Sequence, residues 1–224
     1  MKKLVRLFRK IRMGWINSRL KIPKHDDFDF PCDGFEVNGD PFGKKCIHQG
    51  KVWGKHLGAD FNTEQGTIVH PIANGRVVYV GFHPGTKEHP NWGNIIIIAH
   101  RLTDSSVIYS LYAHLKLILA TKGMTVKKED PIGIVAEKMC PENGWWEESH
   151  IHLGIFLDPE EKYLGGVLPG YDPPGKINEW TDPVEFVESH KKLEPRETKI
   201  RKNFQQKTSQ GKTKKKRKKK HKRR

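Results

Sequence analysis

The most constraining feature of the sequence is an uninterrupted apolar run near its centre, Asn94-Ile-Ile-Ile-Ile-Ala-His100. Successive side chains on a strand point to opposite faces, so four consecutive isoleucines place apolar side chains on both. The run therefore predicts a strand that is covered on both sides. Residues 107–114 have the same character, and we expect the two segments to pair as antiparallel strands. Residues 131–136 and 150–156 supply two more predicted strands.

Turn-forming residues separate these runs. The dipeptide Asn74-Gly75 lies between residues 66–71 and 76–80, and it predicts a hairpin that joins these two segments. Helical periodicity is scarce, although Asp182-Pro183 is typical of a helix start. A chain of 224 residues fits one globular domain with appendages. The predicted fold class is therefore mainly β.

Charge divides the chain into three parts. Residues 196–224 hold sixteen Lys and Arg against one Glu (+15), and residues 1–24 hold nine basic residues and no acid (+9). Because the whole chain carries +15, the middle part must carry −9. We therefore expect a basic N-terminal segment (1–24), a folded domain (25–190) and a Lys/Arg-rich tail (191–224) that is too poor in apolar residues to fold. Such a tail attracts an anionic polymer, a membrane surface or, nonspecifically, nucleic acid.

The N-terminal segment is amphipathic, with Leu4, Leu7, Phe8 and Ile11 at helical spacing between basic residues. It fits a helix on an anionic membrane surface, a helix packed on its own domain, or a frayed arm. Basic residues interrupt every candidate apolar core of a secretory signal, so no cleavable signal peptide is expected. No apolar run approaches the roughly 20 residues that cross a bilayer.

The cysteines predict no metal site. Cys32, Cys46 and Cys140 are an odd number without C-x-x-C spacing, which favours neither a thiolate zinc site nor a disulfide framework. Cys32 and Cys46 are close enough in sequence to pair in an oxidising compartment, but we expect buried, unpaired thiols.

Three short motifs carry the candidate chemistry. His56 and Asp60 form an H-x-x-x-D pair, and imidazole and carboxylate are both ordinary zinc ligands. His150 and His152 lie two residues apart on a predicted strand, so their side chains should share one face. His114 ends another predicted strand, where Tyr112 is expected on the same face.

The order of these motifs, together with segments such as residues 73–81 and 92–100, resembles the LytM/lysostaphin family of zinc endopeptidases over roughly residues 30–157. The resemblance implies an antiparallel β-sheet groove of the duplicated-hybrid-like type. It also implies one Zn²⁺ per chain, with His56, Asp60 and His152 as its ligands and His114 and His150 as the catalytic pair.

The same resemblance implies hydrolysis of peptide bonds in peptidoglycan stem peptides or cross-bridges, in the cell envelope or outside the cell. Because no signal peptide is expected, two other ways of reaching the substrate are also open: attachment to the membrane surface, and release in association with a phage. The alternative is a noncatalytic LytM-like module that binds zinc or cell wall and regulates other hydrolases. One family feature is missing here, because residues 33–55 contain no tyrosine that could bind the oxyanion. A second feature is open: in latent members an upstream asparagine blocks the zinc, and Asn38 is available for that role.

Overall fold

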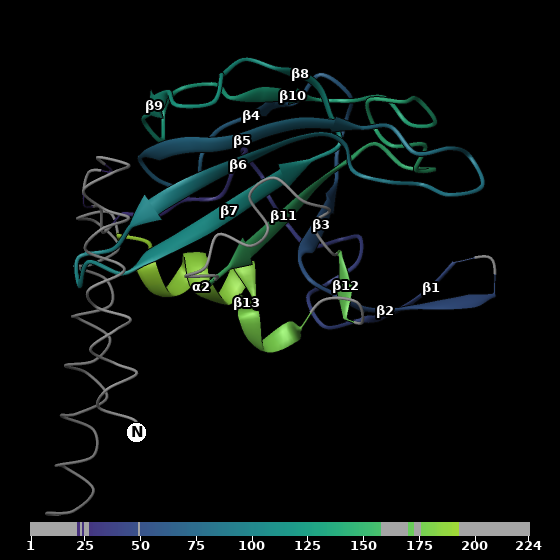
Figure 1. Cartoon of the computed structure of the whole chain (residues 1–224), viewed down its shortest axis with the longest axis horizontal. Helices are drawn as coiled ribbons and strands as arrows, with labels where there is room; N and C mark the ends of the chain where they lie inside the picture. Colours follow the sequence, from purple (N-terminus) through teal and green to yellow (C-terminus); the bar gives the residue numbers. More distant parts are fainter. Residues whose placement is uncertain are drawn as a thin grey trace, which may run out of the picture. The chain divides into compact units, whose positions relative to one another are not determined.

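The computed structural model describes residues 22, 24, 27–48, 50–157, 170–172 and 176–192. Almost all of the predicted amphipathic segment and the basic tail lie outside the described residues. Within the described residues the protein is mainly antiparallel β, as the sequence predicts (Figure 1). The strands and helices are β1 (Lys45–His48), β2 (Lys51–His56), β3 (Ala59–Asn62), β4 (Ile68–Val69), β5 (Gly75–His83), β6 (Gly93–Arg101), β7 (Val107–Ala113), β8 (Leu115–Ile118), β9 (Thr125–Val126), β10 (Gly133–Val135), β11 (His150–Phe156), β12 (Tyr171–Asp172), η1 (Ile177–Glu179), β13 (Trp180–Thr181) and α2 (Pro183–His190).

The largest sheet has the order β13-β11-β7-β6-β5-β9, and β3 pairs with β11 beside it. Its central strand β6 is the isoleucine run, and all four isoleucines are fully buried. Ile96 and Ile98 pack in one apolar cluster, whereas Ile95 and Ile97 pack in another. This confirms the prediction of a strand that is covered on both faces, and it gives the sheet a hydrophobic core on each side.

The predicted hairpin at Asn74-Gly75 is wrong. Strand β4 pairs with β10, and β5 pairs with β6 and β9, so the segments on either side of the dipeptide do not pair with each other. The side-chain carbonyl of Asn74 instead accepts a hydrogen bond from the backbone of Lys128. A local turn signal was overridden here by pairing with strands that lie further along the chain.

Two three-stranded sheets flank the large one, with the orders β4-β10-β8 and β1-β2-β12. Strands β1 and β2 form a hairpin, and β12 joins the far edge of β2 with Tyr171 opposite His56. This pairing brings a segment more than one hundred residues away in sequence next to the H-x-x-x-D motif.

Helix α2 begins as the sequence predicts. The Asp182 carboxylate accepts hydrogen bonds from the backbone N–H groups of Val184 and Glu185, and Pro183 occupies the first helical position. No helix in the described part of the chain is long and apolar enough to cross a bilayer. The three cysteines are unpaired, and Cys32 and Cys46 are buried as expected.

Candidate active site

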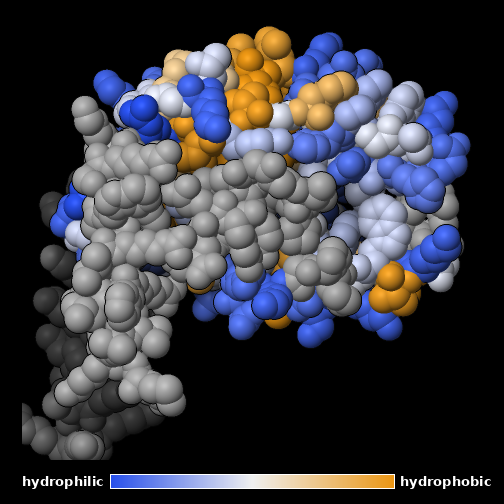
Figure 2. Space-filling view, in the orientation of Figure 1, coloured by the Kyte–Doolittle hydropathy of each residue, from blue (hydrophilic) through white to orange (hydrophobic). Residues whose placement is uncertain are grey.

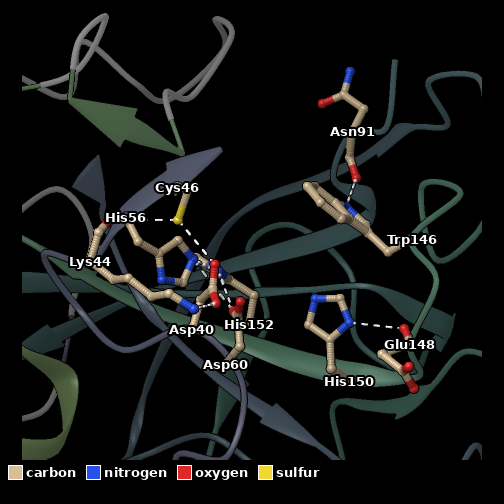
Figure 3. Close-up of polar contacts among 10 residues, drawn as sticks. All are labelled: Asp40, Lys44, Cys46, His56, Asp60, Asn91, Trp146, Glu148, His150 and His152. Carbon is tan, nitrogen blue, oxygen red and sulfur yellow. Dashed lines mark hydrogen bonds and ion pairs between the residues drawn. The ribbon is translucent and has the colours of Figure 1, made fainter. Parts of the chain in front are cut away.

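Three side chains from the predicted motifs converge on one point. Strand β11 pairs with β3 so that His152 lies directly opposite Asp60, and β2 ends at His56. The His152 Nδ1 atom is 2.9 Å from Asp60 Oδ1 and 3.0 Å from His56 Nε2, and His56 Nε2 is 3.5 Å from Asp60 Oδ1. These residues form a group that fits a metal ion, with donor atoms all within 4.8 Å of one another. Figure 3 shows the three side chains directed at one another.

The donor geometry fits zinc. Donors bound to a tetrahedral Zn²⁺ at about 2.0–2.2 Å lie roughly 3.3–3.6 Å apart. One of the three separations falls in this range and the other two are slightly shorter, so small side-chain movements would accommodate the ion. Two imidazoles and one carboxylate leave a fourth position, as in catalytic zinc sites.

Gly58 explains why the first motif has glycine at its centre. A Cβ at this position would lie 2.4 Å from Nε2 of the His152 ring. That nitrogen is buried and has no hydrogen-bond partner, so the ring is held by packing against the backbone of Gly58. The motif therefore supplies two donor atoms, from His56 and Asp60, and its glycine leaves space for the His152 ring that supplies the third.

His150 and His114 lie beside this group, with ring centroids 4.2 Å apart. Nδ1 of His114 is 2.8 Å from the Asn143 carbonyl oxygen, and Nδ1 of His150 is 3.0 Å from the Glu148 carbonyl oxygen. A carbonyl only accepts, so each Nδ1 carries the proton and each Nε2 is the nitrogen that can take one up. Both rings line the same cavity as the three metal-binding candidates.

Tyr112 does not share this face, contrary to the expectation from strand alternation. Strand β7 ends at Ala113, and His114 has a left-handed backbone with φ of 66°. The change of direction turns His114 into the cavity. Tyr112 is fully buried in the core, where its hydroxyl accepts a hydrogen bond from Ile72 N–H.

Burial and charge act on the ionisable groups in opposite directions. Burial raises the pKa of Asp60, but the electrostatic interaction with His56 and the hydrogen bond from His152 outweigh it and hold that pKa below its usual value. Burial lowers the pKa of His56 and lowers that of His114 well below the usual histidine value. These shifts favour the carboxylate form of Asp60 and the neutral form of His56, which are the forms that bind zinc.

Aromatic side chains wall the cavity, which has a volume of about 710 Å³. Trp146 lies between the hairpin and the histidines, with its ring centroid 5.7 Å from Trp53 and 6.1 Å from His114. Its Nε1 donates a hydrogen bond to the Asn91 carbonyl (Figure 3). Trp145 also lines the cavity, and the ammonium of Lys87 lies 5.3 Å from its ring centroid.

The segment that carries these tryptophans is fitted closely to the start of β6. The Gly93 backbone has φ of 60°, and a Cβ there would lie 1.8 Å from the Glu142 carbonyl oxygen. Backbone hydrogen bonds from Asn91 to Gly144 and from Asn94 to Glu142 join the two segments. This contact fixes the Asn143 carbonyl that orients His114.

Sequence reasoning missed Tyr171, which lines the cavity. Its ring packs edge-on against Trp53, and the ring centroid lies 5.9 Å from that of His56. The resemblance predicts a tyrosine upstream of the first motif, where residues 33–55 contain none. Only the pairing of β12 with β2 reveals this residue, and no local pattern in the sequence predicts that pairing.

A second missed group is Asp40 with Lys44 and Cys46, next to the metal-binding candidates in Figure 3. The Asp40 carboxylate accepts hydrogen bonds from the Lys44 ammonium and, at 3.0 Å, from the Cys46 thiol. Burial and the Asp40 contact raise the pKa of Cys46 to about 12, so this thiol stays protonated. It is therefore not a thiolate ligand.

The side chain of Asn38 is bonded to the backbone of Asn62 in β3. Its side-chain oxygen accepts from Asn62 N–H at 2.7 Å, and its amide donates to the Asn62 carbonyl at 3.2 Å. Both the oxygen and the nitrogen of the Asn38 amide are therefore hydrogen-bonded to the backbone of β3. In this structure Asn38 is therefore not a blocking ligand.

An antiparallel sheet that presents two imidazoles and a carboxylate to one cavity, beside two further imidazoles, is built like the site of a metal-dependent hydrolase. Residues 54–162 match the sequence model of peptidase family M23. This confirms the family indicated by the sequence motifs.

Three similar proteins illustrate the relationship. Peptidoglycan DD-endopeptidase ShyB of Vibrio cholerae serotype O1 is 35% identical over 102 residues, which are 46% of this chain and 20% of that protein. A crystal structure of a zinc-containing peptidase from Vibrio cholerae is 29% identical with a TM-score of 0.46, covering 58% of this chain and 36% of that one. The catalytic domain of lysostaphin from Staphylococcus simulans is 21% identical with a TM-score of 0.47, covering 67% and 90%. The chain thus spans about a fifth of the curated relative and about a third of the Vibrio structure.

Proposed function

We propose that this protein is a zinc-dependent endopeptidase that hydrolyses peptide bonds in peptidoglycan stem peptides or cross-bridges. The observation that carries the proposal is the convergence of His56, Asp60 and His152 on one point beside His114 and His150. The match to peptidase family M23 and the name of the Vibrio cholerae relative support this substrate.

We assign one Zn²⁺ to Nε2 of His56, Oδ1 of Asp60 and Nδ1 of His152. When bound, the ion supplies Lewis acidity, which activates water and polarises the carbonyl of the peptide bond. The carboxylate of Asp60 contributes one negative charge that partly offsets the charge of the ion. The buried positions of both imidazoles keep these donors in place before substrate arrives.

We assign proton transfer to His114 and His150. Each holds its Nδ1 proton on a backbone carbonyl, so Nε2 can accept a proton from water and return it to the leaving amine. One of the two rings takes this role, while the other orients the water or donates to the developing oxyanion. Such proton transfer contributes typically 10²- to 10⁴-fold to rate.

We assign Tyr171 as a further donor to the oxyanion. Burial raises the pKa of its phenol, and the nearby carboxylates of Asp60 and Asp40 raise it further, so the hydroxyl keeps its proton. A protonated phenol beside the metal-binding candidates is a hydrogen-bond donor. Tyr171 would then serve in place of the tyrosine that residues 33–55 lack.

We place the protein's action in the cell envelope, where its proposed substrate lies. The basic segments 1–24 and 191–224 would hold the enzyme near an anionic polymer or membrane surface, with nucleic acid as a nonspecific competitor. Residues 25–190 would then be the catalytic domain.

The decisive experiment incubates purified peptidoglycan with the full chain, with and without a chelator, and identifies the fragments by mass spectrometry. We expect new amino termini that appear only when zinc is present, and their masses identify the bond that is cut. The variant His152→Ala should release no fragments. Its matched control is His89→Ala, which changes an exposed histidine outside the cavity lining. Stoichiometric zinc without any fragments would favour the noncatalytic regulator instead.

A further inference from the structure

Asn143 is a polar side chain that the segment before β11 turns into the protein. The structure describes residues 137–149 throughout, and only Asn143 and Gly144 among them are buried. Figure 2 shows largely hydrophilic surface at the end of the molecule where β6 and β11 begin, so an amide directed outward there would be hydrated. The inward position of this amide therefore calls for a contact in the interior.

The amide of Asn143 is bonded at its nitrogen. Nδ2 donates a hydrogen bond of 3.1 Å to the Glu148 carbonyl oxygen. Oδ1 is buried and has no hydrogen-bond partner within the described part of the chain. A buried oxygen that gives up its bond with water without gaining another lowers the stability of the fold. The bond donated by Nδ2 is what an amide provides at this position and an apolar side chain of the same shape does not.

The Glu148 carbonyl that accepts this bond also orients His150. Nδ1 of His150 lies 3.0 Å from the same oxygen (Figure 3). The oxygen therefore accepts from two donors, and the bond from Asn143 helps to set the direction in which the carbonyl points. The side chains of Glu147 and Glu148 are exposed, so the Asn143 amide holds this stretch of backbone from the interior.

The backbone of the same residue holds the other imidazole. The Asn143 carbonyl oxygen lies 2.8 Å from Nδ1 of His114. Asn143 is thus bonded directly to His114 and, through one peptide carbonyl, to His150. The two rings that it joins have centroids 4.2 Å apart. A shift of this one residue would therefore change the position of both rings.

A tight turn fixes Asn143 itself. Its N–H donates to Cys140 Sγ at 3.4 Å, and the N–H of Gly144 donates to the Pro141 carbonyl at 3.0 Å. Gly144 has φ of 75°, and a Cβ there would lie 1.9 Å from the Asn91 carbonyl oxygen, so the turn packs directly on the segment before β6. The backbone of residue 143 is therefore held in place, and the contacts to both histidines start from it.

We propose that Asn143 is a positioning residue for proton transfer, whose carbonyl and amide together set the orientation and separation of the His114 and His150 rings. The proposal rests on the function proposed above, because it takes these two histidines as the proton-transfer pair. With both Nδ1 protons held on carbonyl oxygens, Nε2 is the basic nitrogen of each ring. Asn143 does not line the cavity, so it acts on the reaction through these rings.

The first test is kinetic and uses the zinc-loaded full chain with soluble peptidoglycan fragments. Asn143→Leu keeps the branched shape of the side chain and removes the donor. We expect kcat to fall about 10- to 100-fold, as for other groups that orient site residues, while KM and zinc stoichiometry stay unchanged. The matched control Asn74→Leu removes a side-chain bond to backbone outside the cavity and should keep the parental kcat. Parental kcat in Asn143→Leu, or an equal fall in the control, would overturn the proposal.

The second test observes the imidazole Nδ1 protons by proton NMR, with signals assigned from His114→Asn and His150→Asn. In Asn143→Leu the His150 signal should broaden through faster exchange with solvent, whereas the His114 signal should persist because the backbone carbonyl of residue 143 remains. An unchanged His150 signal would overturn the proposal. Should the leucine variant fail to fold, Asn143→Ala allows the same comparison. An inactive parent protein would count against the proposed endopeptidase, but the NMR comparison does not depend on hydrolysis and still decides whether Asn143 positions His150.

Discussion

His152 and Asp60 face each other across two paired strands, with His152 Nδ1 2.9 Å from Asp60 Oδ1. The register of β11 on β3 sets this contact, so the two donors are fixed by backbone pairing and do not depend on flexible loops. His56 completes the group from the end of a strand in a different sheet. A site of this kind should hold its shape without the ion.

Loss of one donor should abolish tight metal binding while the fold survives. We expect His152→Ala and Asp60→Asn each to weaken zinc binding about a hundredfold or more, because even groups that only orient ligands contribute 10- to 100-fold. Competition with a chromophoric chelator measures the affinity. The circular dichroism spectrum should match that of the parent, and unimpaired zinc affinity in both variants would place the ion elsewhere.

Removal of zinc should also lower thermal stability. An ion that binds only the folded state stabilises it by about 2.7 kcal/mol at one hundred times its dissociation constant. For a domain of this size we expect chelation to lower the melting temperature by roughly 5–10 °C, with recovery on adding Zn²⁺. Calorimetry measures the shift. In His152→Ala the chelator should have little effect, and an equal shift in that variant would contradict the assignment of His152.

His114 and His150 should affect turnover and leave metal binding intact. We expect His114→Asn and His150→Asn each to lower kcat about 10²- to 10⁴-fold while zinc stoichiometry stays at one per chain. Asparagine is chosen at position 114 because it tolerates the left-handed backbone there better than alanine does. Full turnover in either variant would remove that histidine from the proton-transfer pair.

The packing of the tryptophan segment against Gly93 gives a prediction about the cavity wall. Gly93→Ala adds a Cβ that would collide with the Glu142 carbonyl, so residues 140–147 must shift. We expect a stability loss of about 2–4 kcal/mol and a lower kcat, because the carbonyl that orients His114 moves with the segment. Denaturant unfolding and steady-state kinetics measure the two effects.

The control for this change is Gly34→Ala. Gly34 also has a positive φ, of 66°, but a Cβ there would meet nothing within 4 Å. Only backbone strain of about 1–2 kcal/mol should appear, without a change in kcat. Equal effects of the two variants would show that the contact with Glu142 is unimportant.

Patterns confined to one segment predicted much of the fold. The burial of Ile95–Ile98, the strand His150–Phe156 and the start of α2 follow from periodicity and capping, which depend on nearby residues. The error at Asn74-Gly75 arose because the choice of partner strand depends on the whole sheet. A turn dipeptide does not contain that information.

The candidate site likewise combines residues that local patterns predict with residues that only the pairing of distant segments brings in. Spacing and resemblance named His56, Asp60, His114, His150 and His152, and the structure brings all five to one cavity. Tyr171 and Asp40 were missed because each reaches the cavity through pairing with a remote segment. The left-handed turn at His114, which separates it from Tyr112, has no signature in the sequence.

Asn38 has a consequence for how a substrate can approach. Backbone bonds join Gly39 and Asp40 to Asp60, and the Asn38 amide occupies both backbone groups of Asn62. Strand β3 therefore has hydrogen-bonded neighbours on both sides, since β11 lies on the other. An extended peptide cannot be recruited by adding itself to this border as one more strand. The edge of β3 is therefore closed to the chain to be cut, and the aromatic and imidazole rings that line the cavity are available to contact its side chains.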